Sequence, residues 1–228
     1  MPNQIFKRVG FVCALLWAAW CASSAWAQSQ NSRALAFFKT GNEERDLQRK
    51  AAAYQRAVEI DSTFAEAYYN LGMVYKQLQD YPRTEQYLRK ANSFKPNRFT
   101  SEQRNRLLYE LALALKKQKK AAEAESMLRE AKANITDKKL RSMASFELGK
   151  LLFEANRVAD ALEELRDGQR IDASSQTYFK NLIQIAERNL ALQAQYDRAT
   201  QAEKRGEWQE ARALFTQIQT QKADFNDV

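Results

Sequence analysis

Apolar and small residues recur at helical spacing through the central part of the chain. Within 142–172, Leu148 and Leu152 lie four residues apart, and Ala161 and Leu165 repeat that interval. Positions i and i+4 share one face of an α-helix, so the pattern predicts two amphipathic helices. Small side chains on the facing sides let two such helices approach closely as an antiparallel pair. Because one pair leaves apolar surface uncovered, we expect neighbouring pairs to stack.

The same spacing occurs in three copies. In each copy 20 residues separate a Leu from the last small residue of the pattern: Leu71 and Ala91, Leu111 and Ala131, Leu148 and Gly168. A fixed interval in three places is typical of a repeat protein. The chain is therefore expected to be an array of helix pairs.

The segment from Ala65 to Pro96 resembles a tetratricopeptide repeat. The family pattern is W-x2-L-G-x2-Y, then A-x3-F, then P. Its positions are occupied by Tyr68, Leu71, Gly72, Tyr75, Leu88, Ala91 and Pro96, with Thr84 where a small Ala is usual. The resemblance implies an all-α fold, a right-handed α-solenoid of stacked antiparallel helix pairs. It also implies a concave surface, lined by the first helix of each pair, that binds extended or helical peptides.

These copies divide the chain into units. We predict a signal peptide (1–27), a degenerate repeat-like unit (32–64), a repeat (65–98), a repeat with a lengthened first helix (101–138), a repeat (139–175), an additional helix (176–191) and a C-terminal repeat-like unit (192–225). The lengthening follows from the wider spacing of the copies and from helix starts ahead of them. Thr100 and Gln103 form a predicted capping box, and Thr136 or Asp137 is a second candidate cap.

The first 27 residues have the pattern of a secretory signal peptide. Lys7 and Arg8 precede an apolar stretch, and Ala-Trp-Ala at 25–27 forms a small-x-small cleavage site. The mature chain would then begin near Gln28 and be exported, either periplasmic or secreted. The alternative is an uncleaved N-terminal anchor, since about 17–25 apolar residues span a bilayer.

Composition narrows the chemistry further. The chain has no His, and both cysteines, Cys13 and Cys21, lie in the signal segment. This excludes Cys-His zinc sites, thiol nucleophiles and Ser-His or Cys-His catalysis in the mature chain. The net charge of +8 falls to +6 without Lys7 and Arg8. In an exported protein this charge favours acidic proteins, anionic lipids or cell-wall polymers as partners over nucleic acid, or it serves solubility alone.

Clustered carboxylates are the remaining candidates for catalysis. Glu163 with Glu164, and the group Glu123, Glu125 and Glu130, resemble the paired acids of a glycan hydrolase. On helices rich in Lys and Arg, such residues more often form solvated faces with weak ion pairs. We therefore expect no enzyme activity, no cofactor and no metal site.

The resemblance places a candidate binding groove on the first helices. In this family the second, fifth, ninth and twelfth residues of a unit usually face the concave surface. Here they mix apolar and basic residues without an acid: Tyr69, Met73, Lys76, Arg106, Tyr109, Leu113, Lys116, Met143, Phe146, Lys150 and Phe153. Aromatic and Arg side chains often anchor interfaces, so we expect a partner with acidic and apolar character. The alternative is that the three fifth-position aromatics pack against the adjacent pair and only set curvature.

These patterns predict a non-catalytic scaffold or assembly adaptor of the periplasm or cell envelope that binds a protein partner. Two alternatives are a cell-envelope glycan-acting enzyme and a passive structural module that self-associates through its last helix. That helix carries its apolar residues on one side: Trp208, Ala211, Leu214, Phe215 and Ile218. Its other side is polar, as in a capping helix. We therefore expect a monomer with no nucleic-acid partner and no stable membrane span after signal cleavage.

Overall fold

The described part of the chain is helical. The computed structural model describes residues 31–94, 99–172 and 176–226, so the predicted signal peptide at 1–27 and Pro96 lie outside it. These ranges form ten α-helices and no strand: α2 (Ser32–Glu43), α3 (Leu47–Ile60), α4 (Ala65–Gln77), α5 (Tyr81–Ser93), α6 (Ser101–Lys117), α7 (Ala121–Asn134), α8 (Lys138–Glu154), α9 (Val158–Ile171), α10 (Gln176–Lys204) and α11 (Trp208–Asn226). The predicted all-α fold is confirmed. Among the described helices, none has the length and apolar content needed to cross a bilayer.

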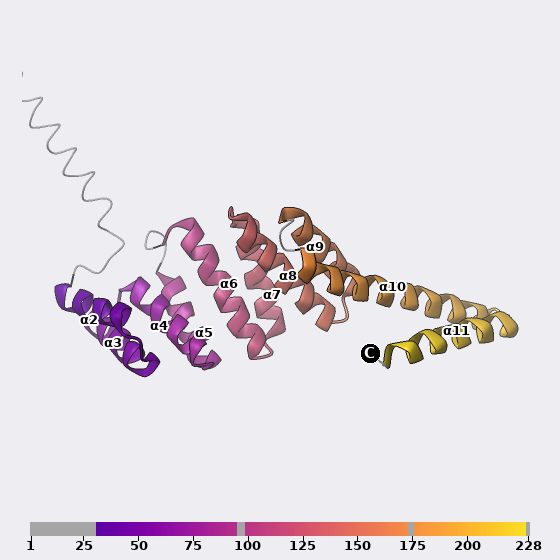
Figure 1. Ribbon diagram of the computed structural model, residues 1–228, viewed down its shortest axis with the longest axis horizontal. Coiled ribbons are helices and arrows are strands. Elements are labelled where there is room, and N and C mark those ends of the chain that lie inside the picture. Colours follow the sequence, from indigo (N-terminus) through magenta and orange to yellow (C-terminus); the bar gives the residue numbers. More distant parts are fainter. Residues whose placement is uncertain (1–30, 95–98, 173–175, 227–228) are drawn as a thin grey trace, which may run out of the picture. The chain divides into compact units, whose positions relative to one another are not determined.

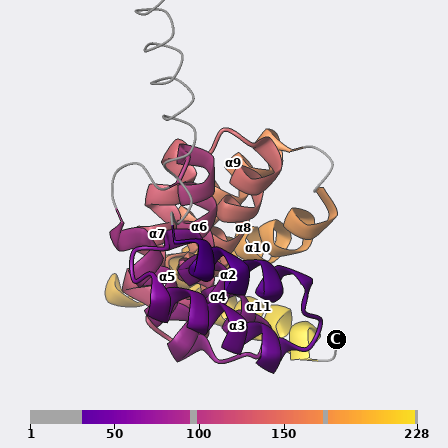
Figure 2. The same cartoon turned by 90° about the vertical axis from the view of Figure 1, so that its left-hand side faces the viewer.

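The helices divide into two compact units, which meet in sequence at residues 135 and 136. The N-terminal unit contains the pairs α2–α3, α4–α5 and α6–α7, with α3 against α4 and α5 against α6 (Figure 1). Figure 2 views this unit from its α2–α3 end. The C-terminal unit contains α8–α9 and α10–α11, with α9 against α10. Within each unit, neighbouring pairs therefore stack.

The residues that define the repeat spacing lie in the core. Leu71, Ala91, Leu111, Ala131 and Leu148 are each no more than 1% exposed. Each buries a hydrophobic side chain at a contact between helices. Burial of a leucine side chain stabilises the folded state by about 1.5–3 kcal/mol. The spacing seen in the sequence is therefore the spacing of buried contacts.

The turn inside a helix pair has the same geometry in four pairs. Gln79, Lys119 and Asn156 adopt positive φ angles of 59°, 62° and 61°, and Gly206 has a φ of 78° at the matching place. The following N–H donates to the carbonyl five residues earlier, at 2.9–3.0 Å. This is the Schellman motif, which pairs carbonyls left open at a helix end. A residue with a Cβ adopts this conformation only at a steric cost.

Side-chain caps fix the starts of α6 and α8. Thr100 Oγ1 accepts a hydrogen bond from the Gln103 N–H (3.2 Å), and Gln103 Oε1 accepts one from the Thr100 N–H (2.9 Å), which confirms the predicted capping box. Of the two candidate caps for α8, Asp137 is the one used, accepting from the Leu140 N–H at 2.6 Å. The capped helices α6 and α8 have 17 residues each, against 13 in α4.

Two glycines set the helix spacing in the C-terminal unit. A methyl group at Gly149 would lie 2.6 Å from Leu165 Cγ and 3.3 Å from the Ala161 carbonyl oxygen. A methyl group at Gly168 would lie 2.7 Å from two ring carbons of Phe179 on α10. Carbon atoms in good contact are about 3.5–4.0 Å apart. Gly149 therefore allows α8 to approach α9, and Gly168 allows α9 to approach α10.

The end of the chain differs from its predicted division. Gln176–Lys204 form one helix, α10, through the boundary that the sequence analysis places after residue 191. No Gly or Pro lies in this range, so no residue breaks the helix. The first half of α10 packs against α9 through Phe179, Ile183 and Ala186, and α10 also pairs with α11. The expected additional helix and the first helix of the last unit are therefore one element.

Candidate functional site

The N-terminal unit carries the predicted groove residues of α4 and α6. Tyr69, Met73, Lys76, Leu113 and Lys116 are half-buried, Arg106 is exposed, and Tyr109 is only 5% exposed. Tyr109 therefore offers almost no surface to a partner. The reason is that α6 is covered on more than one side: Leu107, Leu108, Leu111, Ala112, Ala114 and Leu115 are buried as well. The position within a repeat did not reveal this extra coverage.

Tyr69 is the accessible aromatic residue of this surface. Its ring meets Phe99 edge-on, with ring centroids 6.2 Å apart. Burial raises the pKa of the Tyr69 hydroxyl, Glu110 raises it further, and Arg106 lowers it. These influences place Tyr69 of α4 within electrostatic reach of charged residues on α6. Residues of α4 and α6 therefore lie near each other at this surface.

Lys76 is neutralised within the same surface. Its ammonium group forms an ion pair and hydrogen bond with Glu110 of α6. The side chains are 32% and 14% exposed. The expectation of a groove without an acid is wrong at this point. Glu110 occupies the sixth position of its unit, whereas the prediction rests on the second, fifth, ninth and twelfth positions. A partner therefore meets a compensated pair at Lys76.

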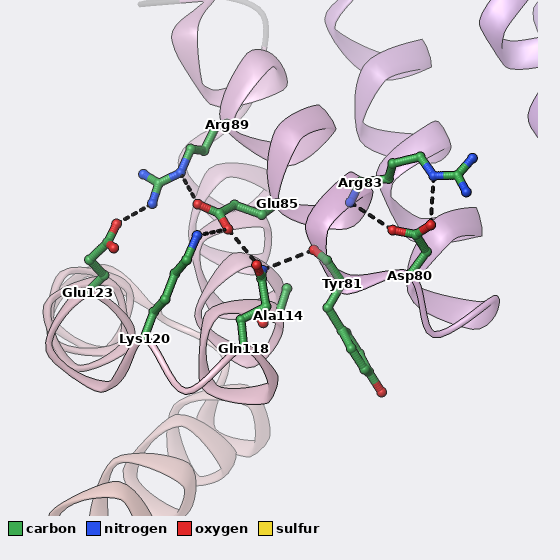
Figure 3. A network of polar contacts seen from close by, with 9 residues as sticks. All are labelled: Asp80, Tyr81, Arg83, Glu85, Arg89, Ala114, Gln118, Lys120 and Glu123. Carbon is green, nitrogen blue, oxygen red and sulfur yellow. Dashed lines mark hydrogen bonds and ion pairs between the residues drawn. The ribbon is translucent and has the colours of Figure 1, made fainter.

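A polar network joins the second helix pair to the third (Figure 3). Glu85 of α5 accepts hydrogen bonds from Lys120 Nζ (2.7 Å) and Gln118 Nε2 (2.9 Å). It also accepts one from Arg89 Nε (2.8 Å), and Arg89 pairs in addition with Glu123 of α7. Burial raises the pKa of the Glu85 carboxyl, but the bonds from Lys120, Arg89 and Gln118 outweigh burial, so the pKa lies below its ordinary value.

The carboxylates considered for catalysis have structural partners in this unit. Glu123 belongs to the network just described, Glu125 pairs with Arg129 at 2.9 Å, and Glu130 pairs with Arg104 at 3.1 Å. These contacts connect neighbouring turns of one helix, the two helices of one pair, or neighbouring pairs. In the described ranges, no three His, Cys, Asp or Glu residues are grouped as they would be around a metal ion.

The predicted groove residues of the C-terminal unit lie on α8. Met143 is 43% exposed, and Phe146, Lys150 and Phe153 are half-buried. Phe146 packs edge-on against Phe179 of α10, with ring centroids 5.2 Å apart. Lys150 Nζ lies 5.7 Å from the Phe146 ring centroid, a cation–π distance. The α8 residues thus form a partly exposed apolar surface beside α10, with one cation held on it.

Besides Met143, the same unit exposes hydrophobic residues that are not among the predicted groove residues. The described residues include five exposed large hydrophobic side chains, all in this unit: Met143, Tyr178, Ile185, Tyr196 and Trp208. Tyr178, Ile185 and Tyr196 all belong to α10. Their spacings of 7 and 11 residues place them on one side of that helix. This spacing is present in the sequence, but a helix ending at residue 191 separates Tyr196 from the other two.

A cleft of about 810 Å³ adjoins that side of α10. Its lining comes from three elements: the start of α9 and the turn before it (Asn156, Arg157, Val158, Ala159 and Asp160), α10 (Asn189, Leu190, Leu192, Gln193 and Tyr196) and α11 (Ile218). Apolar side chains alternate with amides, and Arg157 and Asp160 form an ion pair at 2.6 Å. The volume lies in the range of about 300–1,000 Å³ found for ligand pockets.

Known proteins share this architecture. A family model described as a TPR repeat matches residues 51–79, which span the contact between α3 and α4. The solved structure of YrrB, described as a TPR protein with an unusual peptide-binding site, is 21% identical, covers 83% of this chain and 87% of its own, and has a TM-score of 0.53. A MamA structure is 17% identical, with 86% and 97% coverage and a TM-score of 0.61. No curated protein matches the chain.

A third similar structure is that of PilF from Pseudomonas aeruginosa, which is 19% identical, with 83% and 77% coverage and a TM-score of 0.51. At such identities these structures show the fold alone. The fold, the stacked helix pairs with a common turn, and the matched repeat agree with one another. Together they show that the chain has the tetratricopeptide-repeat fold, with a repeat matched at residues 51–79.

Proposed function

We propose that this protein is a non-catalytic interaction scaffold or assembly adaptor of the periplasm or cell envelope. The observation that carries the proposal is the exposed apolar surface of the C-terminal unit, where Met143 of α8 and Tyr178, Ile185 and Tyr196 of α10 remain accessible. Large hydrophobic side chains that remain exposed on one part of a protein often mark an interaction site. YrrB, which has a similar fold, is described as having a peptide-binding site, and this supports a peptide or protein as the partner.

The α8 surface supplies two kinds of contact to such a partner. Met143, Phe146 and Phe153 provide apolar area, and Lys150 adds a positive charge beside the Phe146 ring. Apolar burial contributes affinity, whereas exposed charge mainly raises the rate of encounter. The N-terminal surface has the same elements in Tyr69, Met73 and Arg106. We therefore expect an apolar partner segment with acidic residues.

A photoreactive residue tests which surface binds. Placed at Met143, it should crosslink to one protein in the native compartment, identified by mass spectrometry and then confirmed with purified components. Matched positions are Gln86 on α5 and Gln184 on α10, which are exposed and outside the proposed surface. The proposal fails if the three positions give the same products, or if the purified product does not bind.

Charge reversal tests the electrostatic part. Arg106→Glu with Lys150→Glu should slow association with that purified partner and weaken its dependence on salt. Lys76 is left unchanged, because its reversal would place two negative charges beside each other at Glu110. An unchanged association rate in the double variant would show that these charges do not assist binding, and only the apolar contacts of the proposal would remain.

The location rests on the first residues of the chain. A basic start, an apolar stretch and Ala-Trp-Ala at 25–27 support export and cleavage. We expect the protein in the periplasmic or secreted fraction with an N-terminus near Gln28, which fractionation and N-terminal sequencing would establish. Recovery of the uncleaved chain with membranes would instead favour an N-terminal anchor.

A further inference from the structure

Exposed cations lie near the starts of α8 and α10 in the C-terminal unit. They are Lys138, Lys139 and Arg141 of α8 and Lys180 of α10. No ion pair or side-chain hydrogen bond joins any of them to a residue that the structure describes. We call these four residues the basic end of the C-terminal unit.

The positions of these cations are not explained by helix stability. Those of α8 lie in its first turn, and a positive charge is unfavourable at a helix N-terminus because the helix dipole is positive there. Asp137 caps α8 by accepting from the Leu140 N–H at 2.6 Å. Of the other acids nearby, Asp167 pairs with Arg170 at 3.4 Å, and Asp172 is half-buried. The basic end therefore carries positive charge that these intramolecular contacts do not use.

Contacts with α9 place the starts of α8 and α10 at the same end of the unit. The Gly168 carbonyl accepts a hydrogen bond from Ser142 Oγ of α8 at 2.9 Å, and a methyl group at Gly168 would meet the Phe179 ring of α10. Ser142 and Phe179 therefore lie at one level along α9. Lys180 follows Phe179 directly, and Lys138 precedes Ser142 by four residues, or about 6 Å of helix.

The cations of α8 surround its start rather than follow one side of it. Successive residues of an α-helix are rotated by about 100°, so Lys138, Lys139 and Arg141 are spread over about 160° of its circumference. Their Cα–Cβ bonds tilt toward the helix N-terminus, so these long side chains extend past the start of α8. A segment lying along one side of α8 would meet only part of the set, whereas a surface that faces the helix starts end-on meets all of it.

We infer that the basic end docks on a membrane surface of anionic phospholipids. Such a surface reaches cations of two helices together, and a lysine ammonium group binds phosphate as a point charge. Clusters of about 4–8 Lys or Arg residues are typical of binding to anionic lipids. Tyr178, two residues before Lys180, is 74% exposed and supplies an amphipathic ring of the kind enriched at membrane interfaces. The inference goes beyond the proposed function, because it needs no partner protein.

Sedimentation with vesicles tests the inference. The mature chain from Gln28 contains every helix that the structure describes. It should sediment with vesicles of equal parts phosphatidylglycerol and phosphatidylcholine, and not with vesicles of phosphatidylcholine alone. Added salt should release it, because exposed charges are screened. Equal binding to the two kinds of vesicle, or binding to neither, would overturn the inference.

Two triple variants locate the contact. The test variant replaces three cations of the basic end: Lys138→Gln, Lys139→Gln and Arg141→Gln. The control variant replaces three exposed cations elsewhere: Lys117→Gln, Lys119→Gln and Lys204→Gln. The test variant should bind the anionic vesicles about a hundredfold more weakly, at about fivefold per cation, and the control variant should lose much less. Equal losses would show attraction by net charge alone and would overturn the inference.

Tryptophan emission tests the orientation on the membrane. Trp208 is the one Trp of the mature chain, and it begins α11, beyond the 29 residues or about 43 Å of α10. Its emission should stay unchanged when vesicles bind. In the double variant Tyr178→Trp with Trp208→Phe, emission should shift to shorter wavelength as the ring enters the interface. A shift of Trp208 without one at position 178 would contradict the inference.

An acidic polypeptide separates the other source of anions. If polyglutamate binds, the test variant abolishes that binding and anionic vesicles do not bind, the inference is overturned and the basic end is assigned to an acidic protein segment. The Met143 crosslink is independent of these results. A confirmed crosslinked partner without vesicle binding leaves the proposed function and removes the inference, and vesicle binding without a crosslinked partner does the reverse.

Discussion

The two units build their helix stacks with different contacts. In the N-terminal unit, charged residues about one repeat apart pair between neighbouring pairs, as Lys76 does with Glu110 and Arg89 with Glu123. In the C-terminal unit, α9 and α10 meet through Gly168 and Phe179, with Leu162 and Leu165 in the same cluster. The C-terminal unit also has an ion pair between neighbouring pairs, Arg166 with Glu187 at 2.7 Å. The difference is the close approach that Gly168 allows there, which the charged links of the N-terminal unit do not provide.

The difference extends to the accessible surfaces. The charged residues of the N-terminal surface include a pair that satisfies itself, whereas the exposed large hydrophobic residues of the described chain all lie in the C-terminal unit. Repeat position alone therefore does not decide what a surface binds. The residues around that position decide whether a cation or an aromatic ring remains available.

The largest expected effect is on the close contact between α9 and α10. In Gly168→Ala the new methyl group would lie 2.7 Å from the Phe179 ring and 2.8 Å from Ser145 Cβ. We expect a loss of about 2–3 kcal/mol in the free energy of unfolding, with faster hydrogen exchange in α9 and α10. Gly206→Ala is the control, because its surroundings are open and only its φ of 78° is unfavourable, which costs about 1–2 kcal/mol. Equal losses would show that the contact is loose.

The next effect concerns the polar link of the N-terminal unit. Glu85→Gln removes the charge bonded by Lys120 and Arg89 and should cost about 1–2 kcal/mol. The folded-state pKa of Glu85 is lowered, so its contribution is present at neutral pH and is lost as the pH falls below the ordinary value of 4.5. Urea unfolding across pH should therefore show the two proteins converging in acid. Glu163→Gln, on an exposed residue of α9, should change stability by less than about 0.5 kcal/mol.

A smaller gain is expected at the turns. Lys119 and Asn156 have positive φ angles of 62° and 61° in the N-terminal and C-terminal units. Lys119→Gly should stabilise the protein by about 1 kcal/mol, because glycine adopts this conformation without a Cβ clash. Asn156→Gly should gain less, since asparagine tolerates the left-handed region better. Midpoints of urea unfolding measure both gains in stability. The expectation is wrong if Asn156→Gly gains more than Lys119→Gly.

The smallest effect compares two buried serines of α8. Ser142 Oγ donates to the Gly168 carbonyl at 2.9 Å, whereas the fully buried Ser145 Oγ has no hydrogen-bond partner among the described residues. Ser142→Ala should cost about 0.5–1.5 kcal/mol. Ser145→Ala should be neutral or slightly stabilising, because an unpaired polar atom leaves the core. Thermal unfolding should show a loss of stability in Ser142→Ala and none in Ser145→Ala, and a loss in both would mean that Ser145 has a role in packing.

Sequence spacing was sufficient for the repeated core. The Leu and small residues of each copy mark buried contacts, and Thr100 with Gln103 marks a helix start, because helix faces and caps depend on residues three or four apart. Such local geometry is independent of the rest of the fold. The all-α array and the cap of α6 could therefore be predicted.

The candidate surfaces depended on contacts between helices. Tyr109 is buried because α6 is covered on several sides, and Lys76 is neutralised by Glu110, 34 positions further along. Neither contact is visible from a position within one repeat. The exposed side of α10 was missed for a different reason, since the predicted units divide this helix after residue 191. Only the unbroken α10 brings Tyr178 and Tyr196 onto one side of one element.

Because α10 is continuous, a small rotation near its contact with α9 displaces its far end. Leu190 is the last residue of α10 in the cluster with α9, and the helix runs on to Lys204, a distance of about 21 Å. If this part of α10 is rigid, a tilt of about 5° at the α9 contact would displace Lys204 by about 2 Å over that length. Because α11 pairs with α10, the turn at Gly206 would move with the end of the helix, and a spectroscopic label at that turn would register the movement.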